Sequence, residues 1–502
     1  MKKHTNFFMS IVLIVSIIAP FGKANAGDVD KNTARKVGAY FLASQFGEKS
    51  ITDNSLQLVY EIPNTLQNIT AVYVFNTNDQ RGYVVVAGSD CVDPIIAYST
   101  EGALDPNNIP PSMMWWLNGT AQDIVYAQNN NLEPSREAAK EWDILIDHQL
   151  PYFGSAKETV QLMTSKWDQS PLYNNLCPVD DGGRCVTGCV ATAMAQILYY
   201  WKYPRVGRYS NYILLNGEAY EANFANTYYN YDLMVDRLTN NSTPEQINAV
   251  ALLNYHCGIS VDMDYSSESS GAVSAKVPYA LQRFFKYEKD SLNHILRSDS
   301  RYYHPNNSTT ANQKDSNWYN DILEQLMKKR PVFYAAADVS SSGADARHAF
   351  VCDGYNTANK FMHFNWGWGG SGTGWCNVYN SKLNTGRGYN FTAEHQAILG
   401  ITPPLDSIPE NMRPTSNVAI NTVPDPFQAN ITPNPASDHI AVYYQIQGEN
   451  SVPMQIYDAT GRLVKQIPLT PASTRISVDI NDLKAGIYIC RIQGHTRKFI
   501  VK

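Results

Sequence analysis

A cysteine stands at the start of an apolar segment whose pattern restricts where it can lie in a folded chain. The segment follows Thr187 and Gly188 and reads Cys189-Val-Ala-Thr-Ala-Met-Ala-Gln-Ile-Leu-Tyr-Tyr-Trp201. Its large apolar side chains recur at the spacing of one helix face: Val190, Met194, Ile197, Leu198 and Trp201. Because that face must be buried, we predict a helix that runs through the centre of a domain, with Thr187 as its N-terminal cap.

The thiol of Cys189 has two interpretations. A cysteine that enters a buried helix is more often a structural core residue than a reactive one. At the first turn of a helix, however, the positive end of the helix dipole stabilises the thiolate, which is the nucleophilic form. The small residues Gly188, Ala191 and Ala193 also leave room for a substrate chain. The choice depends on whether other residues can activate the thiol.

Two downstream motifs favour the reactive interpretation. His348 begins a predicted strand in Arg-His-Ala-Phe-Val, and Asn365-Trp366 follows the apolar strand from Phe361 to Phe364. A Cys, a distant His and an Asn-Trp pair in this order are typical of a papain-like thiol hydrolase. We predict that His348 is the general base and acid, and that the Asn365 side-chain oxygen accepts the imidazole N–H. Trp366 would shield that hydrogen bond from water. The alternatives are a structural histidine and a simple Asn-Trp-Gly turn.

Gln169, in Trp-Asp-Gln upstream of the cysteine, is the candidate for transition-state stabilisation. Its amide can donate a hydrogen bond to the developing oxyanion beside the backbone N–H of Cys189. In isolation, this glutamine would be an ordinary surface residue.

Length and composition describe a multidomain globular protein. The chain has 502 residues, which suggests about three domains. Hydrophobic residues make up 44% and charged residues 17%, which argues against an intrinsically disordered chain. The formal net charge is −6 and no basic patch is evident, which argues against nucleic acid as a partner.

Residues 1–26 have the pattern of a secretory signal peptide. Two lysines precede a short apolar run from Phe7 to Pro20, and Ala24-Asn-Ala26 matches an Ala-x-Ala cleavage site, which would make Gly27 the first mature residue. The run is shorter than a membrane span requires, and no other run approaches 18 apolar residues. We therefore expect export, with an uncleaved anchor as the alternative.

Export permits disulfides, but the eight cysteines do not form a dense framework for so long a chain. The cluster of Cys177, Cys185 and Cys189 has no histidine at zinc-ligand spacing, so we predict no metal site. A local disulfide between Cys177 and Cys185 stays open.

Periodic patterns divide the mature chain into three units. The first, residues 27–158, is a small α+β unit with a helix at 34–46, strands at 58–62, 71–75 and 83–87, and a helix that starts near residue 113. The second, residues 159–403, adds to the cysteine helix two further helices at 245–256 and 318–329, strands at 331–335, 348–352 and 360–364, and a polar loop at 297–317.

A proline-rich linker, residues 404–426, leads to the third unit, residues 427–502. This unit contains short alternating strands separated by turn residues, which predicts a β-sandwich. Its strand segments are 439–444, 454–457, 476–480, 486–490 and 497–501.

The motifs of the second unit together resemble the streptopain family of cysteine peptidases. The resemblance rests on Trp167-Asp-Gln169, the segment from Thr187 to Ile197, Gly258-Ile-Ser-Val-Asp-Met-Asp-Tyr265, His348-Ala-Phe-Val351 and Asn365-Trp-Gly-Trp-Gly-Gly370. It implies an α+β chain with a papain-like catalytic domain of two subdomains and the cleft between them. It also implies that Cys189 is the nucleophile, His348 the base, Asn365 the orienting residue and Gln169 the oxyanion donor.

The same resemblance implies where a substrate would bind. The segment after Met-Asp-Tyr is a substrate-side loop in that family, so Ser270 and Gly271 are expected to contact a peptide backbone, and Trp366 and Arg347 are further substrate-binding candidates. Arg347 departs from the family, because a glycine is expected before the histidine, and it could narrow or charge the cleft wall. The seven cysteines besides Cys189 are a second departure.

The flanking units resemble accessory domains. The first resembles the family's propeptide in Val72-Tyr-Val-Phe-Asn76 and Gly82-Tyr-Val-Val-Val-Ala-Gly-Ser-Asp90, with a permanent N-terminal binding domain as the alternative. The third resembles the C-terminal sorting domain of the type nine secretion system in Pro433-Asn-Pro-Ala-Ser437, Ile456-Tyr-Asp-Ala-Thr-Gly-Arg462 and Leu483-Lys-Ala-Gly-Ile-Tyr488. A carbohydrate- or matrix-binding sandwich is the alternative.

The sequence thus predicts a secreted or outer-membrane surface-attached cysteine endopeptidase, made as a latent zymogen and acting through a thioacyl intermediate. No metal or organic cofactor is expected. The expected partners are protein or peptide substrates, the chain's own propeptide as an intramolecular inhibitor, and the secretion machinery through the C-terminal domain. The alternatives are a surface adhesin or haemagglutinin that retains the protease fold, and a transferase or amidase with the same chemistry. Maturation is expected between residues 140 and 160.

Overall fold

The computed structural model describes residues 27–502 apart from gaps at residues 49, 131, 148–158, 297–308, 339–345, 357–360, 378–392, 409–429, 433–435, 444–450, 459–461, 471–474 and 493–494. The predicted signal peptide and most of the predicted linker lie outside the described residues. The predicted boundary at residue 158 falls in a gap and stays a prediction. The chain divides into two compact units, Met1–Arg413 and Pro414–Lys502, and each contains a hydrophobic core.

The N-terminal region, residues 27–147, is an antiparallel sheet with helices packed on it. Its elements are α1 (Lys31–Phe46), η1 (Asp53–Ser55), β1 (Leu56–Asn64), β2 (Ile69–Thr77), β3 (Tyr83–Ala87), β4 (Ile95–Ser99), α2 (Pro111–Asn129) and α3 (Arg136–Ile146). The strands pair in chain order. The Asp30 carboxylate caps α1 by accepting the backbone N–H groups of Asn32 and Thr33. The predicted helices and strands are present; α3 was not predicted, although its buried side chains Ala138, Trp142 and Leu145 have helical spacing.

The central region, residues 159–408, has a helical part built around α4 (Cys189–Trp201). Every residue from Val190 to Leu198 is buried, so this helix runs through the core as predicted. The cap differs from the prediction: Gly188 occupies the N-cap position, and the Thr187 hydroxyl instead lies 2.7 Å from the hydroxyl of Thr192. The other elements here are β6 (Val179–Asp180), β7 (Gly183–Arg184), β8 (Ser210–Leu215), β9 (Glu218–Asn223), η2 (Phe224–Asn226), α5 (Pro244–Ser260), η3 (Ser274–Lys276), α6 (Val277–Arg283) and η4 (Lys289–Ser291).

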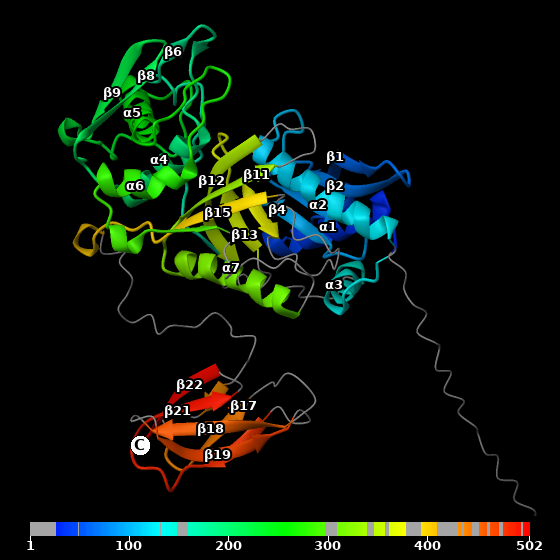
Figure 1. The fold of residues 1–502 in the computed structure, drawn as a ribbon. Helices are drawn as coiled ribbons and strands as arrows, with labels where there is room; N and C mark the ends of the chain where they lie inside the picture. Colours follow the sequence, from blue (N-terminus) through cyan, green and yellow to red (C-terminus); the bar gives the residue numbers. More distant parts are fainter. Residues whose placement is uncertain are drawn as a thin grey trace, which may run out of the picture. The chain divides into compact units, whose positions relative to one another are not determined.

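The second part of the central region is a sheet with α7 (Thr309–Met327) packed on it. Its strands are β5 (Thr159–Gln161), β10 (Asn293–Leu296), β11 (Val332–Asp338), β12 (Ala346–Asn356), β13 (Phe361–Asn365), β14 (Gly374–Asn377) and β15 (Ala393–Leu399), and η5 (Leu405–Ser407) follows. Figure 1 shows α4, α5 and α6 on one side of this region and β11, β12, β13 and β15 on the other. The predicted polar loop at 297–317 is wrong for residues 309–317, which form the start of α7; residues 297–308 lie outside the described chain. The residues before Trp318 are polar and resemble a loop in composition, whereas Trp318 is buried.

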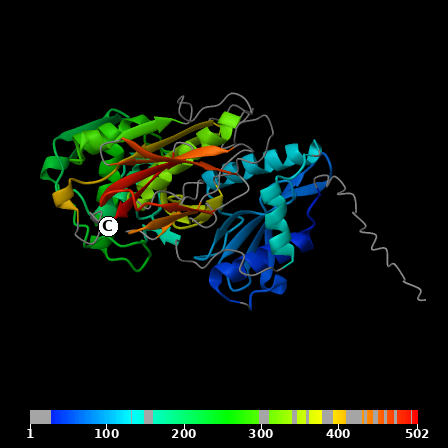
Figure 2. The same ribbon diagram turned by 90° about the horizontal axis from the view of Figure 1, so that it is seen from below.

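The sheets of the two regions join into one. The strand order β1-β2-β3-β4-β14-β13-β12-β11-β15-β10 is continuous, because β4 pairs with β14 through Tyr98 opposite Trp375 and Ala97 opposite Cys376. The rings of Tyr98 and Trp375 stack with centroids 6.2 Å apart. Figures 1 and 2 both show the N-terminal region beside the strands of the central region. The N-terminal region is therefore held through backbone pairing as well as side-chain packing.

The C-terminal unit, Pro414–Lys502, is made of strands, as predicted. They are β16 (Asn430–Thr432), β17 (His439–Tyr443), β18 (Val452–Asp458), β19 (Leu463–Leu469), β20 (Arg475–Asp479), β21 (Gly486–Ile492) and β22 (His495–Val501). They form one sheet in the order β16-β17-β20 and another in the order β19-β18-β21-β22. Side chains from both sheets share one hydrophobic core, including Ile440, Val478, Ile456 and Phe499.

Two properties of the described residues bear on localisation and cofactors. None of their helices combines the length and the apolar character needed to cross a membrane. Nor do these residues contain a group of three or more His, Cys, Asp or Glu side chains placed to bind a metal ion.

Candidate active site

Cys189 lies half-buried in the wall of a cleft of about 1080 Å³ in the central region. The glycine before it is required by the backbone. Gly188 has φ 83°, and a Cβ at this position would come within 2.7 Å of the Met263 sulfur and 3.1 Å of the Ser270 carbonyl oxygen. This turn places the thiol at the first residue of α4, where the helix dipole favours a thiolate.

The structure brings His348 to the same cleft from β12. The imidazole is buried, and its Nε2 lies 2.9 Å from the carbonyl oxygen of Trp366. Because a carbonyl only accepts hydrogen bonds, Nε2 carries the proton in this contact. Nδ1 is thereby left as the ring nitrogen that can exchange a proton with Cys189.

The two side chains change each other's proton affinity. Burial by itself would raise the pKa of the Cys189 thiol, but the charge of His348 and a hydrogen bond to its imidazole leave this pKa below that of a free thiol. Burial by itself would lower the pKa of His348, but Cys189 and the Trp366 carbonyl leave it above the ordinary histidine value. Both shifts favour a thiolate–imidazolium pair.

Asn365 does not make the contact predicted for it. Its Oδ1 accepts the backbone N–H of Gly367 at 3.1 Å, and its Nδ2 donates to the Ser165 carbonyl at 2.6 Å. The side chain also exchanges hydrogen bonds with Gln196. The carbonyl of Trp366, and not the Asn365 side chain, contacts the imidazole. The next residue along the chain thus takes the orienting position that the sequence assigned to the asparagine.

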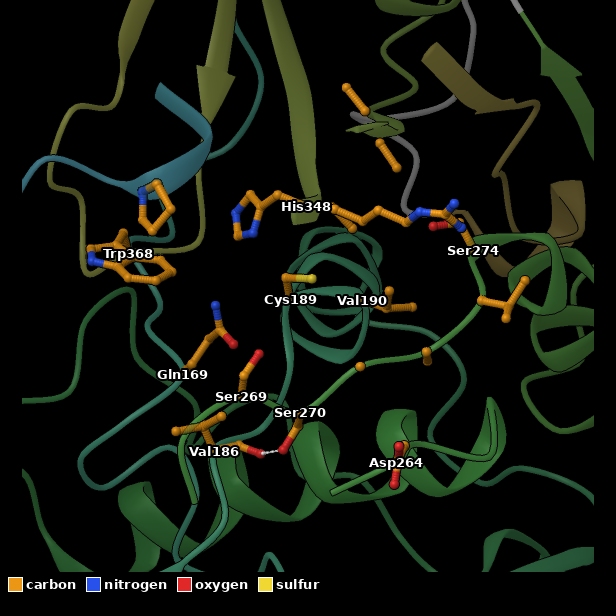
Figure 3. A pocket seen from close by; sticks show the side chains of 18 of the residues that line it. Gln169, Val186, Cys189, Val190, Asp264, Ser269, Ser270, Ser274, His348 and Trp368 are labelled. Carbon is orange, nitrogen blue, oxygen red and sulfur yellow. Dashed lines mark hydrogen bonds between the residues drawn. The ribbon is translucent and has the colours of Figure 1, made fainter. Parts of the chain in front are cut away.

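The two tryptophans of the Asn-Trp-Gly-Trp motif lie in different places, and the one named from the sequence is not the one in the cleft. Trp366 is fully buried, where its indole N–H donates to the Gly372 carbonyl and its ring packs 4.6 Å from Phe350. Trp368 instead lines the cleft, with its ring 5.9 Å from the His348 imidazole (Figure 3). Trp366 was named as a substrate-binding candidate, whereas its indole is a core group. Trp368 was missed, although its position in the motif pointed to the same loop.

Gln169 lines the cleft beside Cys189, as shown in Figure 3. Its carbonyl accepts the backbone N–H of Thr187 at 3.2 Å, and its own N–H donates to the Asp168 carboxylate at 2.7 Å. The backbone of Gln169 is therefore tied to the residue two before the nucleophile. Its side-chain amide extends into the cleft, where it can donate to an oxyanion.

Ser270, Gly271 and Arg347 also line the cleft. The Ser270 hydroxyl, however, donates to the Val186 carbonyl at 2.7 Å (Figure 3), and both backbone groups of Gly271 pair with Asp264. These groups hold the loop after Tyr265 in place and are already engaged. Arg347 is exposed at the rim and precedes His348 in β12.

The N-terminal region reaches the same cleft. Asn108 and Pro111 are among its lining residues, and the Asn108 carbonyl accepts the Ser371 hydroxyl at 2.9 Å. The Tyr83 hydroxyl donates to the Gly372 carbonyl at 2.8 Å, so the loop that follows Trp368 is held from the N-terminal side. An ion pair of Lys166 with Glu101 at 3.0 Å adds to this contact.

Comparison with known proteins follows the same division of the chain. Residues 167–376 match the model of the Peptidase C10 family. Streptopain from Streptococcus pyogenes is 30% identical over 359 residues, which cover 66% of this chain and 81% of streptopain. This chain belongs to the peptidase C10 family. The chain is therefore a cysteine peptidase. On either side of the peptidase match, residues 26–124 match the Spi protease inhibitor and residues 430–502 match the secretion system C-terminal sorting domain.

Two further relatives extend the likeness beyond the central region. The thiol protease/hemagglutinin PrtT of Porphyromonas gingivalis is 30% identical over 413 residues, covering 80% of this chain but only 44% of PrtT. The solved fragment of prointerpain A from Prevotella intermedia, a Cys-to-Ala mutant, aligns with TM-score 0.53 and 30% identity. It covers 70% of this chain and 99% of the fragment. The papain-like, propeptide-bearing α+β architecture predicted from the sequence is confirmed.

Proposed function

We propose that this chain is a secreted cysteine endopeptidase, made as a latent zymogen, in which Cys189 is the nucleophile and His348 the general base and acid. The observation that carries the proposal is the shared cleft: the thiol stands at a helix N-terminus, beside an imidazole whose Nε2 is held by the Trp366 carbonyl. The Asn365 side chain holds the peptide group of that carbonyl by accepting the Gly367 N–H. The proposed reaction uses protein groups alone and needs no metal or organic cofactor.

The residues divide the reaction between them. The Cys189 thiolate attacks the scissile carbonyl carbon, and the Gln169 amide and the Cys189 N–H donate to the resulting oxyanion. The His348 imidazolium gives its proton to the leaving amine as the C–N bond breaks, which leaves a thioester. His348 then takes a proton from water, the hydroxide attacks the thioester, and the C–S bond breaks to return the thiolate beside the His348 imidazolium.

In this proposal Ala272, next to Gly271 in the loop, contacts the substrate backbone in place of Ser270 and Gly271. Gly271 pairs through both backbone groups with Asp264. Adjacent residues of an extended segment point their backbone groups to opposite edges, so those of Ala272, which also lines the cleft, face away from Asp264.

The proposed latency rests on Asn108 and Pro111, which line the cleft from the N-terminal region. Residues that line the cleft from the N-terminal side restrict the space available to a peptide. Removal of the N-terminal region would open the cleft, and the C-terminal sorting domain would carry the protein to the outside of the cell or to its surface.

The direct test uses purified precursor and matured protein with casein as substrate. We expect hydrolysis by the matured protein only, loss of hydrolysis after treatment with a thiol-directed inhibitor, and labelling of Cys189 on mass mapping. N-terminal sequencing would locate the maturation site. Labelling of another cysteine with loss of activity would contradict the nucleophile assignment.

A surface adhesin is the second candidate, favoured by the match to PrtT, whose name includes hemagglutinin. An adhesin would bind erythrocytes or other cells without cleaving protein. Retained cell binding by matured protein that has no detectable activity on casein would favour it. Transfer of the acyl group to an added amine in preference to water would instead favour a transferase.

The activity should show two limbs with pH. Lowering the pH protonates the Cys189 thiolate, and its lowered pKa places the acid limb below the pH at which a free cysteine ionises. Raising the pH removes the proton of the His348 imidazolium, and its raised pKa places the alkaline limb above ordinary histidine titration. Measurement of kcat/KM on a peptide across pH checks this; an alkaline limb at the ordinary histidine pKa would contradict the pair.

Gln169→Ala should reduce kcat by about 10²–10³ with a smaller change in KM, because its amide is proposed to bind the oxyanion and not the ground-state peptide. Steady-state kinetics on a peptide ester and a peptide amide would measure this. Gln169→Glu, which keeps the size but loses the amide donor, serves as the matched variant. Equal kcat in both variants and the parent would remove Gln169 from the mechanism.

A further inference from the structure

Gln196 is a buried polar residue in the otherwise apolar core of α4, and it has no role in the chemistry described so far. Its side chain is fully buried. It lies seven residues after Cys189, two helical turns along the same face. A buried amide of this kind is stable only if its hydrogen-bonding groups are satisfied, so its partners indicate what it holds.

The Gln196 carbonyl oxygen accepts three donors from two separate segments. These are the Ser165 hydroxyl at 2.9 Å, the Trp167 backbone N–H at 3.3 Å and the Asn365 Nδ2 at 3.0 Å. Its Nε2 donates back to Asn365 Oδ1 at 3.4 Å. The nucleophile helix is thereby joined to the segment that leads to Gln169 and to the end of β13.

Asn365 passes this connection on to the catalytic imidazole. Its Oδ1 also accepts the Gly367 N–H, and this hydrogen bond closes a turn across Trp366. The carbonyl inside that turn is the one that contacts His348 Nε2 at 2.9 Å. The direction of the carbonyl therefore depends on the Asn365 side chain, which Gln196 holds.

We propose that Gln196 is a positioning residue that aligns the three parts of the site: Cys189 on its own helix, Gln169 through Ser165 and Trp167, and His348 through Asn365 and the Trp366 carbonyl. This inference rests on the proposed function and deepens it. Gln196 touches neither substrate nor the reacting atoms, and it acts through these neighbours.

The test is Gln196→Met, which keeps the approximate shape but removes the hydrogen-bonding groups. We expect kcat to fall about 10- to 100-fold with KM little changed, as misplacement of catalytic groups does. The second readout is the rate at which iodoacetamide alkylates Cys189 as a function of pH. The alkaline limb is the change in this alkylation rate as the His348 imidazolium loses its proton. It should move to lower pH by roughly 0.5–1 unit, because a less firmly held Trp366 carbonyl stabilises the imidazolium less.

Met194→Leu is the matched control, because Met194 lies buried on the same helix outside this network. We expect it to alter thermal stability without moving the alkylation limb. The titratable groups around the cleft are the same in Gln196→Met and Met194→Leu, namely Cys189, His348, Asp168, Asp262, Asp264, Glu268, Lys276 and Arg347. A shift in Gln196→Met that is absent from Met194→Leu therefore reports the hydrogen bonds and not a change of nearby charge.

Two milder variants keep the inference testable if Gln196→Met does not fold. Ser165→Ala removes one donor to Gln196 and should move the limb in the same direction by a smaller amount. Gln196→Glu keeps the acceptor oxygens and should retain more activity than Gln196→Met. An unmoved alkylation limb in Ser165→Ala and in each Gln196 variant that folds would overturn the proposal.

The outcome is separable from that of the proposed function, because alkylation does not need a protein substrate. If the parent protein fails to cleave casein but the variants show the expected limb shift relative to it, the endopeptidase assignment is contradicted and the positioning role of Gln196 is kept. A parent that cleaves casein, with an unmoved limb in the variants, would do the reverse.

Discussion

Cys189→Ala should abolish hydrolysis of casein by the matured protein while the fold stays intact. The thiolate is the only group in the proposed mechanism that forms a bond to the substrate, and loss of a nucleophile in a comparable triad lowers kcat by about 10⁶. Alanine has high helix propensity and leaves α4 unperturbed at its first residue. Activity on casein and the thermal unfolding midpoint, measured on the same preparation, check both halves of the expectation.

Cys257→Ala is the control for this experiment. Cys257 is a fully buried thiol on α5 whose pKa burial raises well above the free value, so it stays protonated and unreactive. This substitution makes the same chemical change away from the cleft, and we expect activity to persist. Casein cleavage that survives in Cys189→Ala but fails in Cys257→Ala would show that the assignment of Cys189 as the nucleophile is wrong.

Asp353→Ala should lower the free energy of unfolding by about 3–5 kcal/mol, the range found when one partner of a buried pair is removed. The Asp353 carboxylate is fully buried, accepts from His363 Nδ1 at 2.7 Å and also accepts the Met163 N–H at 3.2 Å. Its backbone carbonyl accepts the Leu162 N–H at 2.7 Å. The substitution leaves the imidazole and an amide unpaired in the core and loosens the segment after β5. Denaturant unfolding followed by fluorescence would measure the loss.

The matched control is Glu324→Ala, which removes the exposed ion pair between Glu324 on α7 and Lys328 just after this helix. A solvent-exposed pair four residues apart contributes little, so we expect almost no change in unfolding. Equal losses in the two variants would show that the Asp353 pair adds nothing beyond a surface charge.

The sequence predicted local elements well where periodicity was strong. Patterns that depend on near neighbours in the chain are carried by the cysteine helix, by the strands from Val332 to Asn365 and by the strands of the C-terminal unit. It failed where an element begins without an apolar signal, as at Thr309. The sequence interpretation also missed α3. This helix has few buried side chains and is too short for its helical pattern to be clear.

The site residues show the same division. Cys189, His348 and Gln169 were placed in one cleft correctly, because motif order and residue chemistry restrict which side chains can meet. The partner of a side chain is another matter. The hydrogen bond of His348 is made by a backbone carbonyl that every residue possesses, so no residue type in the sequence could reveal it.

The substrate-side loop illustrates the limit further. Ser270 has the right chemistry for a peptide contact, but its hydroxyl is used by Val186, a residue 84 positions earlier. Hydroxyl and amide groups are satisfied by whatever the fold brings near them, and a buried one is costly to leave unpaired. Residue type alone therefore overestimates which polar groups are free for a ligand.

The sequence by itself determined the class of this protein: an exported cysteine peptidase whose central region places a thiol at a helix start, with a histidine and an Asn-Trp pair downstream. Periodicity, motif order and targeting signals are local and survive without the fold. Only the tertiary structure decided that Trp366 and not Asn365 contacts the imidazole, that Gln196 links the three parts of the site, and that β4 extends the central sheet through β14. Each of these joins segments far apart in the chain, and their meeting is set by packing of the whole core.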